Sequence, residues 1–154
     1  SLALLNTNPF EEKQELKDRR NKILKELNAL DLMSVMKSNY ISRYFPDDCK
    51  DKNKLIQKCV DMASTMDKKV FYNQSVALRD RKDQTAILED LNCKTLLICG
   101  ERDKMCPVSY HSDMNKMIKI SDLIVLEGVG HMPMLECPQK VNNHLKNFFL
   151  KKNK

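Results

Sequence analysis

Residues 94–128 read KTLLICGERDKMCPVSYHSDMNKMIKISDLIVLEG and place an amphipathic stretch between two apolar runs. The runs "KTLLICG" and "DLIVLEG" have the length and the apolar character of buried strands. The stretch between them has helical spacing, because large apolar side chains recur every three or four residues: Tyr110, Met114, Met117 and Ile118. Strand, helix and strand within about 33 residues make a βαβ unit with parallel strands and a right-handed crossover. The segment therefore predicts an α/β fold.

A strand and a helix are expected at the start of the chain. Residues 2–7 read as a short strand that is apolar on both faces, as in a covered parallel sheet. A helix is predicted from about residue 10 to 30, with Asn8 as its cap, Pro9 at its first position and Glu11 completing a capping box. Its apolar stripe consists of Leu16, Ile23, Leu24, Leu27 and Leu30.

The region from residue 32 to 90 continues as three or four short amphipathic helices without a strand pattern. Roughly 80 residues thus separate the first strand from the next, far more than the dozen or so of a simple crossover. We therefore predict a helical subdomain at 10–90, inserted into a partial α/β core formed by 1–9 and 91–154. The core would hold about three parallel strands and a closing helix at about 138–150, whose core-facing side chains are Val141, Leu145, Phe148 and Phe149.

Two polar residues with complementary chemistry follow the two strands of the βαβ unit. Asp103 comes after "LLICGER", and His131 comes after "LIVLEGVG". Catalytic groups of open parallel sheets gather at the carboxyl ends of the strands, so we expect these two side chains to meet. An imidazole can take a proton from a nucleophile while a carboxylate orients it and stabilises the imidazolium. Gly128 and Gly130 would allow a sharp turn and a close approach of the backbone, and Pro133 would stiffen the exit.

The segments "TLLICGERDKMCP" and "LEGVGHMPMLECP" resemble the C-terminal part of the α/β-hydrolase fold superfamily. In that superfamily the acid of a Ser-His-Asp triad follows one strand and the histidine follows the next. The resemblance implies that residues 10–90 are the helical cap and that Asp103 and His131 are catalytic residues. Within the superfamily it leans toward capped esterases, enol-lactonases and haloperoxidase-like hydrolases. It implies a carboxylic ester, a lactone or a similar small apolar acyl compound as substrate.

The sequence departs from this superfamily in lacking a nucleophile elbow. The elbow G-x-S-x-G needs glycines four positions apart, whereas the three glycines here are Gly100, Gly128 and Gly130. The first strands and the oxyanion-hole loop of such a fold are also missing from the sequence. Since the chain opens at Ser1 inside an apolar run that resembles no signal peptide, we expect a fragment, inactive alone, of a longer hydrolase.

Other nucleophilic or basic residues are expected to have structural roles. Cys106 lies three positions after Asp103, but it belongs to the loop of the acid and has no elbow geometry. Ser109 and His111 are expected on the surface of the helix that follows. His144, in the closing helix, is likewise expected to be structural or solvated.

The six cysteines contain no C-x-x-C pair and are accompanied by no paired histidines, so we expect no metal site and no cofactor. Cysteines in or near an apolar strand, such as Cys93 and Cys99, are ordinarily reduced core residues. This usage favours a reducing, cytoplasmic compartment.

The formal net charge of the 154-residue chain is +6, which raises the question of nucleic-acid binding. The lysines are spread over several segments, including the tail at 151–154, with few aromatic residues between them and no nucleic-acid motif. We therefore expect a solvated basic surface and no nucleic-acid site. No apolar run reaches the roughly 20 residues needed to cross a bilayer.

Three hypotheses of function remain open at this point. The first is a serine hydrolase that acts on acyl substrates, and the second is a non-catalytic α/β-hydrolase relative that binds a ligand or a protein. The third, a nucleic-acid-binding protein, ranks last. We also expect self-association through the edge of residues 2–7, because an unpaired apolar strand attracts another chain.

Overall fold

A computed structural model describes residues 1–150 of the chain; the basic tail at 151–154 lies outside the described residues. The chain divides into two compact units. The sheet unit consists of Ser1–Pro9, Arg43–Lys52 and Thr85–Lys154, and the helical unit consists of Phe10–Ser42 and Asn53–Gln84. This division differs from the predicted one at Arg43–Lys52 and at residues 85–90, which were assigned to the helical subdomain but group with the sheet. The reason for the first segment is that Tyr44, in Arg43–Lys52, binds the backbone of the loop that carries His131, as described below.

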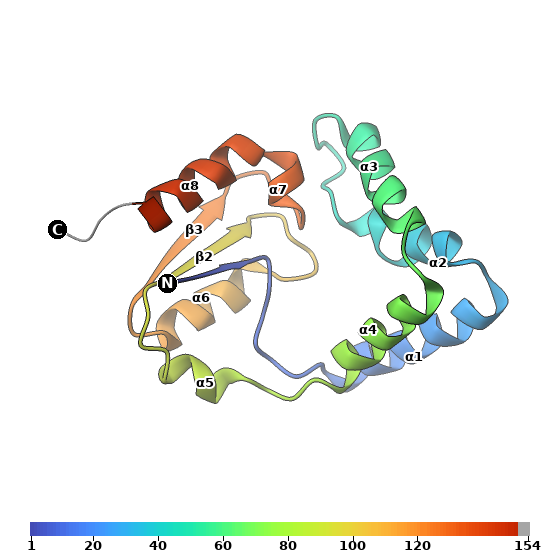
Figure 1. The fold of residues 1–154 in the computed structure, drawn as a ribbon, viewed down its shortest axis with the longest axis horizontal. Helices are drawn as coiled ribbons and strands as arrows, with labels where there is room; N and C mark the ends of the chain where they lie inside the picture. Colours follow the sequence, from blue (N-terminus) through green and yellow to red (C-terminus); the bar gives the residue numbers. More distant parts are fainter. Residues whose placement is uncertain (151–154) are drawn as a thin grey trace. The chain divides into compact units, whose positions relative to one another are not determined.

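The sheet unit is built on three parallel strands, β1 (Leu2–Leu5), β2 (Thr95–Gly100) and β3 (Ser121–Leu126) (Figure 1). Their order in the sheet is β1-β2-β3, so β2 is the central strand of the described sheet. The register pairs Leu2 with Thr95 and Thr95 with Ser121, which brings the carboxyl ends of the strands to one edge. The predicted α/β class with about three parallel strands is confirmed.

Helices cover both faces of this sheet (Figure 1). Side chains of a strand alternate between the faces, so Leu96 and Ile98 pack on one side and Leu97 on the other. The first side is closed by α8 (Pro138–Leu150), which contributes buried Val141 with Leu145 and Phe148. The second side is closed by α5 (Thr85–Glu89) and by α6 (Val108–Met117), the predicted crossover helix. Phe149 was expected in the core but is 52% exposed, because it lies beyond the stripe set by Val141 and Leu145.

The helical unit contains α1 (Gln14–Ala29), α2 (Leu32–Asn39), α3 (Lys52–Ser64) and α4 (Lys68–Asp80). Helix α1 buries Ile23, Leu24 and Leu27, as its apolar stripe predicts. Aspartate side chains cap the N-termini of α2 and α4. Asp31 accepts a hydrogen bond from the backbone N–H of Ser34, and Asp67 accepts one from the backbone N–H of Lys69. The predicted short amphipathic helices are thus present.

The predicted start of the first helix is wrong. Helix α1 begins at Gln14, its N-cap residue is Lys13, and no side chain caps it. Asn8 lies in the sheet unit instead, where its Nδ2 is 3.6 Å from Cys106 Sγ. Glu12 is buried and paired with Arg20 through two 2.5 Å hydrogen bonds, so the segment before α1 is held by side chains rather than by a capping box.

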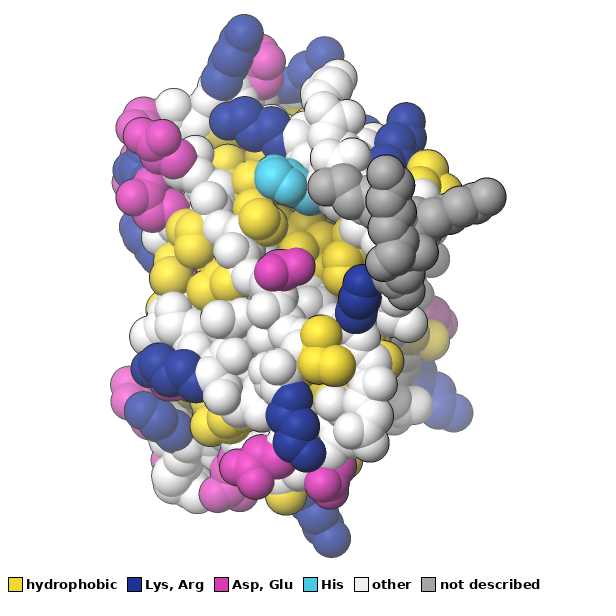
Figure 2. Space-filling view, turned by 90° about the vertical axis from the view of Figure 1, so that its left-hand side faces the viewer, with side chains coloured by type: hydrophobic (Ala, Val, Ile, Leu, Met, Phe, Trp, Pro, Cys, Tyr) yellow, Lys and Arg dark blue, Asp and Glu magenta, His cyan; other side chains and the backbone are white. Residues whose placement is uncertain are grey.

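The surface carries mixed charge and apolar side chains. Figure 2 shows lysine and arginine side chains interspersed with acidic ones on the face that it draws. Mixed signs are typical of a solvated surface rather than of a nucleic-acid footprint. Within residues 1–150, every helix is too short or too polar to traverse a lipid bilayer.

Candidate active site

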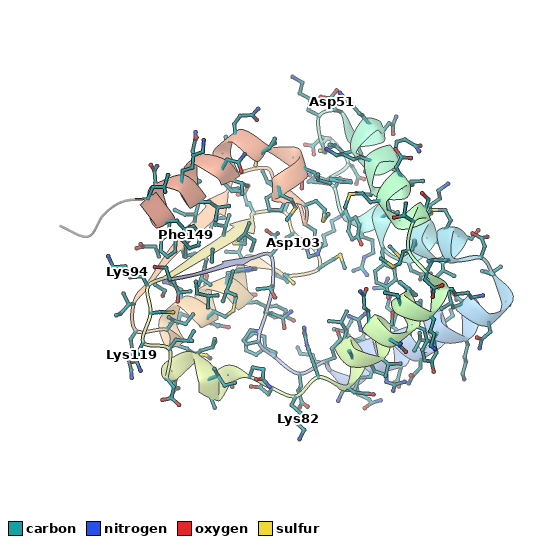
Figure 3. The ribbon with its side chains drawn as sticks, viewed as in Figure 1. Asp51, Lys82, Lys94, Asp103, Lys119 and Phe149 are labelled. Atoms are coloured by element: carbon teal, nitrogen blue, oxygen red, sulfur yellow. The ribbon has the colours of Figure 1, made fainter. Side chains whose placement is uncertain are left out.

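Asp103 and His131 lie together at the carboxyl-end edge of the sheet. Figure 3 shows Asp103 at this edge, while Lys94, which precedes β2, lies at the opposite one. His131 Nδ1 is 2.8 Å from Asp103 Oδ2. The pair spans 28 residues of sequence, and its contact follows from the parallel register of β2 and β3, which delivers both loops to the same place.

The Asp103 carboxylate is fully enclosed and accepts four hydrogen bonds. Its side chain has 0% exposure. Oδ1 accepts from the backbone N–H groups of Met105 (2.7 Å) and Cys106 (2.9 Å), while Oδ2 accepts from His131 and from Asn6 Nδ2 (2.7 Å). Burial alone would raise the pKa of Asp103, but the hydrogen bonds from His131, Cys106 N and Asn6 outweigh it and lower that pKa. The carboxyl group is therefore held ionised.

Asn6 is a site residue that sequence reasoning missed. It directly follows β1 and has a φ of 45°, a left-handed conformation that asparagine tolerates better than most residues. This turn ends the strand at Leu5, not at the predicted Thr7, and aims Nδ2 at Asp103 Oδ2 and at the carbonyl oxygen of Gly130 (3.2 Å). The available signal was an asparagine at the end of a strand, which is too common to predict a contact 97 residues away.

The loop that carries His131 is fixed by its backbone. Gly128 has a φ of 71°, which explains why a glycine stands at that turn. The N–H of His131 donates to the carbonyl oxygen of Tyr44 (2.8 Å), and the ring of Tyr44 lies 5.7 Å from the imidazole. A Cβ added to Gly130 would come within 2.6 Å of that same carbonyl oxygen and 2.7 Å of Pro46. The predicted close approach at Gly130 is thus an approach to the segment Arg43–Lys52.

Glu136 binds the backbone on either side of His131. Its carboxylate accepts from the N–H of Gly130 (2.9 Å) and of Met132 (3.2 Å), and Cys49 Sγ lies 3.8 Å away. Glu136 ends α7 (Pro133–Glu136), a short helix that the sequence did not predict. Burial raises the pKa of Glu136 even though these backbone donors act in the opposite direction. Glu136 therefore fixes the backbone of the loop that carries His131.

The segment after β1 is joined to the loop and helix that follow Asp103. The N–H of Thr7 donates to His111 Nε2 (3.2 Å), and His111 Nδ1 lies 3.3 Å from the carbonyl oxygen of Pro107. His111 is 0% exposed, so its expected surface position is wrong: it occupies the inner face of α6, on the same turn as Met114. Burial lowers the pKa of His111, which favours a neutral ring that donates from Nδ1 and accepts at Nε2.

Cys106 lies beside the Asp103 and His131 pair. Ligand atoms of Asp103, Cys106 and His131 all lie within 4.8 Å of one another, a grouping that the spacing of the cysteines did not predict. Cys106 is buried, as is Asp103, whereas the His131 side chain is 19% exposed. Ser109 is exposed, as expected, and no disulfide forms among the described cysteines.

The arrangement fixes which nitrogen of His131 can act as a base. Because Nδ1 faces a carboxylate that stays ionised, Nδ1 carries the proton of the neutral ring and Nε2 is the acceptor. The buried carboxylate would stabilise the imidazolium that forms when Nε2 takes a proton. The pair can therefore support general base catalysis toward a group located on the Nε2 side.

The chain matches one protein family and resembles solved hydrolases. The model of the Ndr family matches residues 1–151. A thermophilic esterase from Thermogutta terrifontis, solved with malate bound, superposes with a TM-score of 0.88 at 21% identity, over 97% of this chain and 55% of that one. The enol-lactonase from Burkholderia xenovorans LB400 has a TM-score of 0.84 at 15% identity, over 97% of this chain and 55% of that one.

A sequence relative gives a shorter match. Protein ABHD8 of Mus musculus is 38% identical over 61 residues, which are 40% of this chain and 14% of that protein. The chain thus spans about half the length of the two solved hydrolases and a small share of this relative. Structural likeness at such low identities establishes the fold, and the family match covers almost the whole chain. The chain has the α/β-hydrolase fold and belongs to the Ndr family.

Proposed function

We propose that Asp103 and His131 are the acid and the base of a Ser-His-Asp hydrolase whose nucleophile lies outside these 154 residues. The observation that carries this proposal is the 2.8 Å contact between His131 Nδ1 and a buried carboxylate at the carboxyl ends of parallel strands. The order of acid and then histidine agrees with hydrolases of this fold. The similar structures include proteins described as an esterase and an enol-lactonase, which supports carboxylic esters or lactones with small apolar acyl groups as substrates.

In this mechanism the reaction passes through an acyl-enzyme. His131 Nε2 accepts the proton of the serine hydroxyl as the serine oxygen attacks the carbonyl carbon, and Asp103 stabilises the resulting imidazolium. The imidazolium then protonates the departing alcohol. Water next attacks the acyl-enzyme, with His131 again as the base, and releases the acid together with the free serine. The lowered pKa of Asp103 keeps its charge in place throughout.

The helical unit has its own role under this proposal. We propose that it is the cap that selects the acyl group, since its four helices supply several partly buried apolar side chains and no member of the Asp103 and His131 pair. A cap of this kind would set substrate preference without changing the chemistry.

Labelling with a serine-reactive fluorophosphonate tests the proposed function in the full-length protein. We expect covalent labelling and ester turnover, with both lost by a factor of about 10³ or more in His131→Gln. His144→Gln, a matched substitution on α8, should leave both unchanged. Protein limited to residues 1–154 should show negligible turnover. Absence of labelling, together with an unimpaired ligand-binding function in His131→Gln, would instead support the non-catalytic alternative.

A further inference from the structure

We propose that Asp103, Cys106 and His131 form a binding site for Zn²⁺ and for similar thiophilic divalent cations. The three side chains offer a carboxylate oxygen, a thiol sulfur and an imidazole nitrogen, and these atoms all lie within 4.8 Å of one another. Asp103 and Cys106 are buried, while His131 is partly open to solvent. Two of the three ligands are therefore buried, and the third is accessible to solvent.

The backbone around Asp103 holds the cysteine in this place. The N–H of Cys106 donates to Asp103 Oδ1 at 2.9 Å, so the turn from 103 to 106 brings the thiol back beside the carboxylate. Asn6 adds a buried polar atom, because its Oδ1 has no hydrogen-bond partner among the described residues, although its Nδ2 lies 2.7 Å from Asp103 Oδ2. The amide of Asn6 is therefore a buried polar neighbour of the carboxylate.

The donor set matches the coordination chemistry of zinc. Zinc takes thiolate, imidazole and carboxylate ligands, with bonds of about 2.0–2.3 Å that place neighbouring ligands of a tetrahedral ion about 3.3–3.5 Å apart. To reach that spacing, the 2.8 Å contact between His131 and Asp103 must widen and the longer separations, which are at most 4.8 Å, must close by about 1 Å. Three protein ligands leave the fourth position for water or another exogenous ligand.

Metal binding would exclude the role of His131 as a base. With an ion on Nδ1 the neutral ring carries its proton on Nε2, so Nε2 can no longer accept one, and the thiol of Cys106 releases its proton to solvent as it binds the metal. Hydrolysis and metal binding then become alternative states of the same three residues. This consequence rests on the proposed function, whereas the metal site itself does not.

Titration of the reduced, metal-free protein with Co²⁺ tests the site without relying on activity. Co²⁺ bound to a thiolate in a tetrahedral site gives a sulfur-to-metal charge-transfer band and visible absorption. We expect both to saturate at one equivalent and to be abolished by added Zn²⁺. Cys106→Ser should remove the charge-transfer band, and His131→Gln should weaken Zn²⁺ binding by at least about tenfold, since the loss of even an outer-shell partner costs that much.

A second cysteine provides the matched control. Cys137→Ser removes a half-buried thiol of the sheet unit that is not part of the cluster, and it should leave the spectrum and the affinity unchanged. Circular dichroism would establish that the variants are folded. A charge-transfer band that persists in Cys106→Ser, or a wild-type protein that binds no Co²⁺, would overturn the proposal. Loss of fluorophosphonate labelling with an intact Co²⁺ spectrum would refute the hydrolase proposal alone.

Discussion

At the residue scale, the carboxylate of Asp103 organises its surroundings through its four hydrogen bonds. Two come from its own turn, one from His131 and one from Asn6, which belongs to a different strand end. The site is therefore assembled from three separate segments of sequence. Its stability depends on buried donors, and buried hydrogen bonds to charged groups contribute more than neutral ones.

Asn6 should stabilise the folded protein through its contact with Asp103. We expect Asn6→Gly to lower the free energy of unfolding by about 1–3 kcal/mol at neutral pH, because it leaves a buried carboxylate oxygen one donor short. Glycine tolerates the φ of 45°, so this cost reflects the lost hydrogen bond and not backbone strain. Urea denaturation measures it, with the exposed Asn143→Gly in α8 giving the cost of a helical glycine for comparison.

The pH dependence of this effect has a definite sign. The pKa of Asp103 is lowered from its ordinary value of 3.8, so its stabilising contribution is present above 3.8 and is lost as pH falls through the folded-state pKa. The difference between wild type and Asn6→Gly should therefore shrink in acid. An equal difference at neutral and strongly acidic pH would show that Asn6 does not act through the Asp103 charge.

Glu136 should give the opposite pH dependence. Its pKa is raised from 4.5 by burial, so its stabilising contribution is present below 4.5 and is lost as pH rises through the folded-state pKa. We expect the melting temperature of wild type, relative to Glu136→Gln, to fall as pH increases from about 4 to 7. A constant difference over that range would contradict the assignment of Glu136 as a half-buried clamp that resists ionisation.

Sequence reasoning at this scale succeeded for residues whose position alone determines their neighbours. Asp103 and His131 follow adjacent parallel strands, and the register brings such residues together whatever their intervening sequence. Asn6 and Cys106 could not be placed in the same way. Their contacts depend on one left-handed residue and on the path of one turn, and neither leaves a periodic pattern in the sequence.

At the element scale, the join between β1 and α6 depends on the protonation state of His111. The ring accepts from the N–H of Thr7 and lies against the carbonyl oxygen of Pro107, an arrangement that requires the neutral form. From the sequence, His111 is expected on the outer surface of the helix, as is usual for a polar helical residue. Helix α6 buries His111 and Met114 together, so its inner face is wider than its apolar residues indicate.

Mild acid should weaken the hydrogen bond from the N–H of Thr7 to His111. The pKa of His111 is lowered from 6.5 by burial, so its contribution to stability is present above 6.5 and is lost as pH falls through the folded-state pKa. His111→Gln can still accept from Thr7 but cannot be protonated, and we expect it to lose less stability than wild type between pH values of about 7 and 5. Melting temperatures across that range provide the measurement, with His144→Gln as the control. Identical profiles for wild type and His111→Gln would rule out this role.

The elements that sequence predicted best were those with long apolar or amphipathic runs. Strands β2 and β3 and helices α6 and α8 lie where periodicity placed them. The start of α1 was displaced by four residues, because the Glu12 pair with Arg20 and the Asn8 contact with Cys106 hold the preceding segment outside the helix. Side-chain contacts between distant segments overrode a local capping signal.

At the scale of the whole molecule, one edge of β1 has no strand partner among the described residues. All four residues of β1 are only partly buried, and they read LALL. Unpaired apolar edges form hydrogen bonds with other strands. We predict that protein limited to residues 1–154 self-associates through this edge, with a second copy of the chain as its partner.

Light scattering tests this association. The apparent mass should exceed that of one chain and rise with concentration, and Leu2→Lys, at the β1 position that packs against neither core cluster, should return it to that of a monomer by placing a charge on the edge strand. Ile120→Lys, at an exposed position before β3, is the matched control and should not change the mass. A monodisperse monomer at all concentrations would contradict the prediction.

The central claim is that the carboxylate at 103 and the imidazole at 131 act as one pair. Nuclear magnetic resonance of protein labelled with ¹⁵N in histidine tests it most directly, because a proton shared between the two groups resonates far downfield and is bonded to Nδ1. We predict such a resonance for His131, and we predict that Asp103→Ala removes it while the spectrum stays that of a folded protein. A His131 ring that carries its proton on Nε2, with no downfield Nδ1 resonance in the wild type, would contradict the account.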